Sequence, residues 1–270
     1  ARTAVRPTPA AVRWPLAVLA GGVACFIALI YGLIPLGSLV RLWGSDWSLS
    51  LRHYAFASSA EGATPIWNSV RLALVAGVIG TVVALVTAYL VERKRPPGRR
   101  AIEGAALLPA ALPGTVVGLG YILAFNVPPL ALTGTLWILV ASVVFWKLPV
   151  AVLAGINALK QIDPAIEEAA VSLGAGSVAT FWRVVRPLLT GTAFSVFIYF
   201  FINGMVTVSA VIFLIYPGFN LASVAILNQV ENGYPGAACA LGTIILAIVI
   251  GSVLLLRALV GGDRVAVLKL

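Results

Sequence analysis

Residues 163–189 read DPAIEEAAVSLGAGSVATFWRVVRPLL, a charged and water-compatible segment between two strongly apolar ones. Asp163 can cap the N-terminus of a helix through its side-chain oxygen, and Pro164 suits the first helical position. Glu167 and Glu168 follow in the first turns, where negative charge complements the helix dipole. The segment therefore predicts a capped helix that lies outside the apolar runs.

The second half of this segment predicts a turn and another short helix. Gly174 ends or bends the first helix, and Pro187 restarts the chain into the next apolar run. Two interpretations of this segment are open: an amphipathic hairpin that lies on lipid headgroups, or a protruding surface that docks on a protein partner. The acidic start disfavours an anionic inner leaflet, whereas the small residues Ala169 and Ala170 allow a partner to approach closely.

The composition around this segment is that of an integral membrane protein. Of the 270 residues, 61% are hydrophobic and 10% are charged, and the mean hydropathy is +1.04. A soluble domain carries roughly 25% charged residues. So much apolar surface cannot be buried in one small core, and some of it must face lipid. Because the apolar runs are continuous rather than alternating, we expect an all-α membrane protein.

A membrane-spanning helix needs about 20 mostly apolar residues. By this measure the chain forms a single transmembrane domain, 1–270, with six spans and a polar loop at 160–187 between the fourth and the fifth. The six expected spans are 14–40, 65–91, 104–126, 134–159, 188–214 and 237–260.

The positions of lysine and arginine predict how the spans are oriented. If the N-terminus is cytoplasmic, fourteen of the 18 basic residues fall in cytoplasmic segments, including the hairpin ERKRPPGRR at 92–100. Cytoplasmic loops of membrane proteins carry such an excess. We therefore expect both termini and the 160–187 loop on the cytoplasmic side, and we assign the net charge of +9 to topology rather than to nucleic-acid binding.

The polar loop resembles the EAA motif of permease subunits in binding-protein-dependent ABC importers. The family pattern reads EAA, three residues, G, nine residues, I, one residue, L-P. Valine here replaces the isoleucine and arginine replaces the leucine. The matching positions are Glu168, Ala169, Ala170, Gly174, Val184, Arg186 and Pro187.

This resemblance covers about 67–256 and implies the MetI-like fold of type I ABC importer permeases in a bacterial inner membrane. It implies that the loop holds a coupling helix that docks on a cytoplasmic ATPase dimer, which binds the ATP and Mg. It also implies a second permease half, identical, homologous or fused, and an extracytoplasmic substrate-binding protein. The residues assigned to ATPase coupling are Glu167, Glu168, Ala169, Ala170, Gly174 and Pro187.

Two stretches, 113–135 and 205–227, look most like permeases of the ferric-iron and 2-aminoethylphosphonate type. This similarity implies a cargo of ferric iron or of a phosphonate or phosphorylated anion. Polyamine and sulfate permeases are more distant alternatives. An ATP-independent secondary transporter is a further alternative, although it would be expected to carry membrane-embedded acids for ion coupling, and the predicted spans lack a pair of acids.

The sequence predicts no enzymatic chemistry on this chain. No lysine follows a glycine, so the phosphate-binding loop G-x-x-x-x-G-K-[ST] is absent and ATP must be bound by a partner. His53 is the only histidine, and Cys25 and Cys239 lie far apart. We therefore expect no catalytic residue, no metal site and no cofactor on this chain.

Four polar residues within the spans are candidates for the translocation pathway. Lys147 is the one charge near the middle of a span, and such a charge should face the interior of the bundle or a wet cavity. Asn203 and Thr207 share one face of the fifth span, and Ser209 follows them. The alternatives are a lysine that snorkels or bonds to carbonyls, and polar side chains that only bond neighbouring helices.

Overall fold

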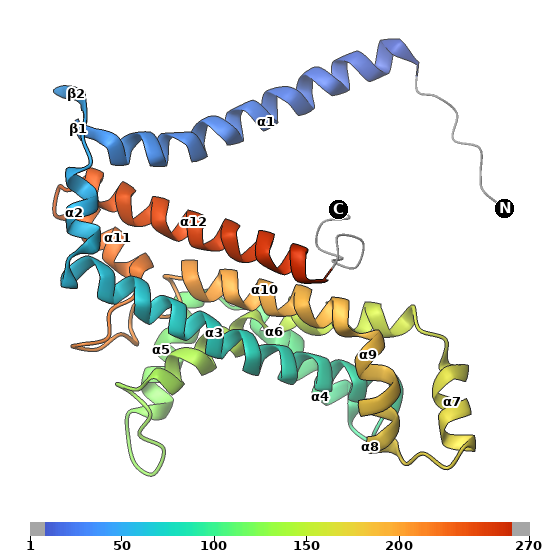
Figure 1. The fold of residues 1–270 in the computed structure, drawn as a ribbon. Coiled ribbons are helices and arrows are strands. Elements are labelled where there is room, and N and C mark those ends of the chain that lie inside the picture. The colour runs from blue at the N-terminus through green and yellow to red at the C-terminus, as the bar shows by residue number, and fades with distance from the viewer. Residues whose placement is uncertain (1–8, 261–270) are drawn as a thin grey trace.

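The longest apolar runs form long helices in the computed structural model, which describes residues 9–260 (Figure 1). Within these residues, four helices are long and apolar enough to cross a membrane. They are α1 (Ala10–Leu39), α3 (Ala60–Tyr89), α6 (Leu136–Lys160) and α12 (Pro235–Val260).

The other two predicted spans are bent rather than straight, and the expectation of a continuous helix over 104–126 is wrong. That stretch contains the end of α4 (Arg99–Leu107), the 3-10 turn η2 (Leu108–Ala111) and α5 (Gly114–Phe125), and the chain bends by 116° between the two arms. Pro113 stands at the break with extended backbone angles, because its ring disfavours continuation of the preceding helix.

The second bent pair joins the polar loop to α10 (Thr190–Val206) at an angle of 75°. If each bent pair counts as one span, the described chain has up to six. The fifth run ends as a helix at Val206, short of the predicted 214, and an irregular segment follows. The elements before the bend are α8 (Ser177–Thr180), the π-helical turn η3 (Phe181–Val185) and α9 (Arg186–Leu188).

Short elements lie at the two ends of the bundle. One end, here called the hairpin end, holds the antiparallel strands β1 (Val40–Leu42) and β2 (Asp46–Leu49), with α2 (Arg52–Ser58) and α11 (Ala222–Glu231) beside them (Figure 1). The other end, here called the α7 end, holds α7 (Pro164–Ser172) and α8 (Figure 1). The basic turn η1 (Leu90–Lys94) prolongs α3 towards that end.

The core lies where α3 packs against both α6 and α10. Small residues allow these helices to approach closely: Gly80 lies against the Phe200 ring, and Gly204 lies against the backbone of Ala73. The small residues of α3 therefore serve packing within this chain. Large side chains that are fully buried around these contacts are Leu72, Leu139, Val143, Val152, Leu159 and Phe200.

Helix α1 differs from the others because the chain does not bury it. Residues 11–31 are all exposed, and α1 contacts the bundle mainly through α12 near the hairpin end (Figure 1). Its exposed side chains are mostly apolar, for example Val18 at 71% and Phe26 at 64%. Such a surface is suited to lipid or to another membrane protein rather than to water.

We predict that Gly204→Ala destabilises the bundle by about 1–3 kcal/mol, the usual cost of overpacking. The new Cβ would lie 2.8 Å from Ala73 Cα, a backbone atom, so α3 and α10 must separate. Thermal unfolding in mild detergent measures the effect. Gly251→Ala in α12 is the control, because nothing lies within 4 Å of the Cβ it would add. Equal unfolding temperatures for the two variants would contradict this account.

Candidate functional site

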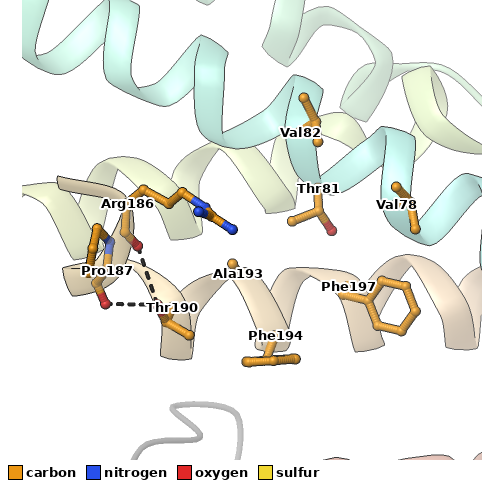
Figure 2. Close-up of a pocket in the computed structure, with 9 residues that line it drawn as sticks. All are labelled: Val78, Thr81, Val82, Arg186, Pro187, Thr190, Ala193, Phe194 and Phe197. Atoms are coloured by element: carbon orange, nitrogen blue, oxygen red, sulfur yellow. Dashed lines mark hydrogen bonds between the residues drawn. The ribbon is translucent and has the colours of Figure 1, made fainter. Parts of the chain in front are cut away.

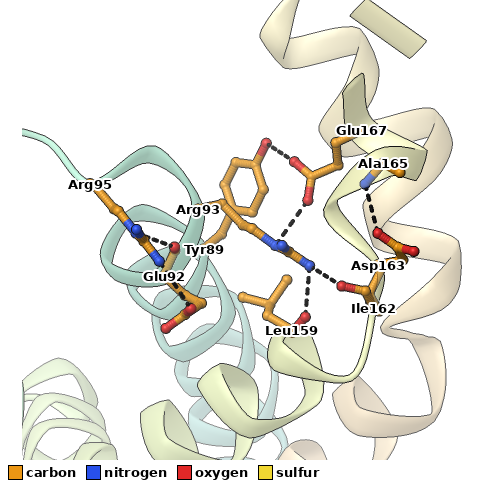
Figure 3. A network of polar contacts seen from close by, with 9 residues as sticks. All are labelled: Tyr89, Glu92, Arg93, Arg95, Leu159, Ile162, Asp163, Ala165 and Glu167. Carbon is orange, nitrogen blue, oxygen red and sulfur yellow. Dashed lines mark hydrogen bonds and ion pairs between the residues drawn. The ribbon is translucent and has the colours of Figure 1, made fainter. Parts of the chain in front are cut away.

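The helix predicted at the start of the polar loop is present and capped as expected. Asp163 is the N-cap residue of α7, and its Oδ1 accepts a hydrogen bond of 2.9 Å from the Ala165 N–H (Figure 3). Pro164 takes the first helical position. The start of α7 is therefore fixed by local chemistry, since both features satisfy or remove N–H groups that a helix N-terminus leaves unpaired.

Gly174 forms the turn that ends α7. Its φ is +85°, in the left-handed region that side chains disfavour. The Gly174 N–H donates to the Val171 carbonyl, and the Ala175 N–H donates to the Ala170 carbonyl, which closes the helix end. The loop beyond this turn leads into α8 and returns the chain to the bundle.

The tip formed by α7, the Gly174 turn and α8 exposes apolar side chains. Leu173 is 89% exposed and Val178 is 72% exposed, and Ile166 and Val171 are also exposed. Glu168, Ala169 and Gly174 are exposed as well, whereas Ala170 is half-buried. This surface, here called the loop tip, therefore combines one acid, small residues and protruding aliphatic groups.

Glu167 points away from the loop tip, although it is adjacent to Glu168 in sequence. Its Oε1 lies 3.0 Å from Arg93 Nε, and its Oε2 accepts a hydrogen bond of 3.3 Å from the Tyr89 hydroxyl (Figure 3). The Glu167 and Arg93 side chains are only 15% and 12% exposed. The structure thus separates two acids that the sequence analysis grouped together.

Arg93 connects three elements at the α7 end. While its Nε faces Glu167 of α7, its Nη2 donates to the carbonyls of Leu159 at 2.7 Å and Ile162 at 2.6 Å (Figure 3). Leu159 is in the last turn of α6 and Ile162 lies just beyond it, where helix carbonyls lack the donors of a continuing helix. The sequence analysis used Arg93 only as a topological charge, because nothing local in the basic hairpin reveals these distant partners.

Among the predicted pathway residues, Lys147 has an aromatic partner. Its Nζ lies 3.7 Å from the centroid of the Trp146 ring, which is within cation–π distance. The Trp146 indole N–H donates to the Leu112 carbonyl at 3.2 Å, beside the break before α5. Trp146 and Ser209 Oγ together occupy the space that a side chain at Gly114 would fill. Ser209 and Trp146, the partner of Lys147, therefore both lie beside the helix break that precedes α5.

Asn203 and Thr207 satisfy backbone groups of their own region. The Asn203 amide donates to the Tyr199 carbonyl at 2.8 Å, one turn back in α10. The Thr207 carbonyl accepts a hydrogen bond of 2.6 Å from Ser223 of α11. The Thr207 hydroxyl is buried, and it has no hydrogen-bond partner among the residues that the structure describes. These two residues mark the point where α10 gives way to irregular backbone.

A surface groove of about 490 Å³ runs between α3 and α10 (Figure 2). Its walls are mainly apolar, and Arg186 and Pro187 lie at one end of it (Figure 2). Pro187, which the sequence analysis placed in the coupling set, is exposed here, and its carbonyl accepts a hydrogen bond from the Thr190 hydroxyl at 2.8 Å. The other lining residues are Val78, Thr81, Val82, Ala193, Phe194 and Phe197.

An apolar helical bundle with interrupted helices is an arrangement that many membrane transporters share. The family described as "Binding-protein-dependent transport system inner membrane component" matches residues 63–261. The chain belongs to this family and is therefore a multi-pass permease of an inner membrane, a transport component rather than an enzyme.

Similar proteins agree with this assignment. Over 265 residues the chain is 36% identical to the ferric transport system permease protein FbpB of Actinobacillus pleuropneumoniae, covering 97% of this chain but 39% of that protein. It is 26% identical over 239 residues to the putative 2-aminoethylphosphonate transport system permease protein PhnV of Salmonella typhimurium, covering 85% and 89%. The chain thus spans about two fifths of the length of the ferric relative.

The fold is similar to that of a solved transporter. A bacterial alginate ABC transporter, in complex with an alginate pentasaccharide-bound periplasmic protein, superposes with a TM-score of 0.74 over 93% of this chain and 95% of that one. The sequence identity is 17%, so the likeness concerns the fold alone. It supports the all-helical permease fold expected from the sequence.

We predict that Trp146→Phe lowers the unfolding free energy by about 1–3 kcal/mol, because the Leu112 carbonyl at the helix break loses its donor in an apolar setting. The phenyl ring keeps most of the packing. Trp137→Phe in the same helix is the control, since the Trp137 side chain is 60% exposed. Thermal unfolding in detergent compares the two. If the control loses as much stability as Trp146→Phe, the indole bond has no special role.

Proposed function

We propose that this chain forms one half of the translocation pathway of an ATP-driven importer and couples to a cytoplasmic ATPase through its loop tip. The observation that carries the proposal is the exposed surface made by Glu168, Ala169, Leu173 and Gly174 at the α7 end. It coincides with the EAA motif of the family to which the chain belongs.

The chemistry of the loop tip suits a docked protein. A leucine that is 89% exposed on a capped, rigid turn is unfavourable in water and favourable in a partner's apolar groove. The small side chain of Ala169 and the bare Gly174 let a partner backbone approach, and Glu168 can pair with a basic group of that partner. In this proposal two ATPase subunits bind ATP and Mg, and this chain supplies the surfaces that they move.

The membrane orientation follows from the same proposal. If the loop tip meets a cytoplasmic ATPase, the α7 end is cytoplasmic, and so are both termini. The basic turn η1, at the end of α3, then lies on the side where basic residues are enriched in membrane proteins. The hairpin end faces outward, where an extracytoplasmic binding protein delivers cargo. A second permease half, identical, homologous or fused, completes the pathway.

Ferric iron is the proposed cargo, supported by the 36% identity to a ferric permease. A phosphonate or phosphorylated anion is the second candidate, favoured by the positive charge of Lys147 and by the more distant likeness to an aminoethylphosphonate permease. We place Lys147, Asn203, Thr207 and Ser209 along the pathway. Their proximity to irregular backbone supports this, because interrupted helices in transporters tend to surround the substrate site.

We predict that Leu173→Asp weakens ATPase binding by at least about 2 kcal/mol, since it places a charge at the centre of an apolar contact. Co-purification of the ATPase with the membrane chain, from the native membrane in mild detergent, measures the loss. Leu51→Asp is the matched control, because Leu51 is 69% exposed in the segment between β2 and α2 at the hairpin end. Undiminished ATPase recovery with Leu173→Asp would overturn the docking assignment.

We predict that Lys147→Met reduces cargo uptake about tenfold or more, the effect of losing one bond to a charged group, while leaving the complex assembled. Methionine keeps the length of the side chain and removes only the charge. Uptake of labelled ferric iron and of labelled aminoethylphosphonate into proteoliposomes gives the readout. Lys160→Met, at the exposed end of α6, is the control. Normal uptake with Lys147→Met would exclude Lys147 from the pathway.

A further inference from the structure

The polar network at the α7 end lies outside the loop tip, and neither the proposed ATPase docking nor the proposed translocation pathway uses it. It joins Glu167 of α7 to Tyr89 at the end of α3 and to Arg93 in η1 (Figure 3). The two acids of α7 thus face different surroundings, since Glu168 is exposed and Glu167 is nearly buried. Glu168 is therefore available to a partner, whereas Glu167 is paired within its own chain.

The covalent connections of the loop reach only two of the three central helices. Helix α7 follows α6 after a short turn, and α8, η3 and α9 lead directly into α10. Helix α3 lies far away in sequence and continues into the basic hairpin and α4 instead. A movement of the loop would therefore be transmitted to α6 and α10 through covalent connections, but to α3 only through side-chain contacts.

Arg93, in the extension of α3, makes such side-chain contacts with the end of α6 and with α7 at the same time. Its Nη2 bonds to the Leu159 and Ile162 carbonyls at the end of α6, and its Nε faces Glu167 Oε1 at 3.0 Å. A planar guanidinium makes these contacts from two separate nitrogens, Nε and Nη2, whereas an ammonium holds all of its donors on one nitrogen. Because both charged side chains are largely removed from solvent, losing either one would leave the other without its compensating charge.

Tyr89 adds a second attachment that reaches the returning arm of the loop. Its hydroxyl donates to Glu167, while its ring lies 4.8 Å from the Phe181 ring of η3, measured between centroids. The Tyr89 side chain is buried, and Val185 of the same returning arm is fully buried in the adjoining core. Both arms of the loop are therefore attached to the end of α3, one by charge and one by ring packing.

We propose that Glu167 is a positioning residue that fixes α7 to α3 through Arg93 and Tyr89, so that displacement of the loop tip moves α3 together with α6 and α10. This inference rests on the proposed coupling to an ATPase. It differs from the docking role that the sequence analysis assigned to Glu167. The contact sets how much of the ATPase movement reaches the membrane helices, and it does not hold the ATPase itself.

The test uses the complete complex of permease, ATPase and binding protein in proteoliposomes. Glu167→Gln keeps the shape of the side chain and removes its charge. We expect normal recovery of the ATPase and at least about a fivefold fall in cargo taken up per ATP hydrolysed, the lower end of a typical coupling between two sites. Glu168→Gln is the matched control on the neighbouring residue, and we expect it to reduce ATPase recovery instead.

Arg93→Lys is the second variant, because lysine keeps the charge but cannot reach Glu167 and two carbonyls together. We expect the same loss of uptake per ATP with retained ATPase recovery. Size-exclusion profiles and thermal unfolding identify any variant that fails to fold. Tyr89→Phe keeps the contact with Phe181 and removes only the hydroxyl, so we expect a smaller loss from it than from Glu167→Gln.

Three results would overturn the positioning role. Uptake per ATP could be unchanged in both Glu167→Gln and Arg93→Lys, in which case the contact transmits nothing. ATPase recovery could fall as much with Glu167→Gln as with Glu168→Gln, in which case Glu167 belongs to the docking surface. Absence of any ATPase from the unmodified complex, by contrast, would refute the proposed function itself and this inference with it.

Discussion

The structure depends on how backbone carbonyls are satisfied where apolar helices are interrupted. Hydrocarbon offers no hydrogen-bond donors, so a helix that breaks at membrane depth needs other donors, side chains among them, for the carbonyls it frees. Trp146 supplies one to the Leu112 carbonyl before α5, and Ser142 supplies one to the Ala210 carbonyl in the irregular segment after α10. Both donors stand on α6, which is continuous. The unbroken helix thus makes the two interruptions possible.

The same requirement operates at the α7 end with a charged donor. Arg93, which belongs to the extension of α3, donates to the Leu159 carbonyl of α6 and to the Ile162 carbonyl just beyond it, and the carboxylate that balances this charge comes from α7. One guanidinium therefore joins the extension of α3 to two successive segments, the end of α6 and α7, that lie far from it in sequence. If the loop tip docks on an ATPase as proposed, the end of the bundle beside it behaves as one connected body, while the exposed loop tip is left available to that partner.

The sequence predicted what depends on local chemistry. The Asp163 cap, the Gly174 turn and the long apolar helices follow from residues within a few positions of each other. The bend before α5 was missed, because the hydropathy of 104–126 outweighed the turn signal of its internal Pro113. The environment of Glu167 could not be predicted, since it is set by Arg93, which is distant in sequence, and by how α3 meets α6. The family resemblance grouped Glu167 with Glu168 and did not predict the contacts that separate them.

Helix α1 stands apart from these constraints. Residues 11–31 are exposed throughout, whereas the later part of α1 packs on α12, where Gly37 lies against Cys239 and Ser38 is buried. A close-packed helix such as α3 must fit its neighbours in shape, whereas the exposed part of α1, where it faces lipid, has only to be apolar. Its sequence can therefore drift among hydrophobic residues without a packing cost. Where lipid is its only neighbour, this stretch of α1 is constrained by composition rather than by shape.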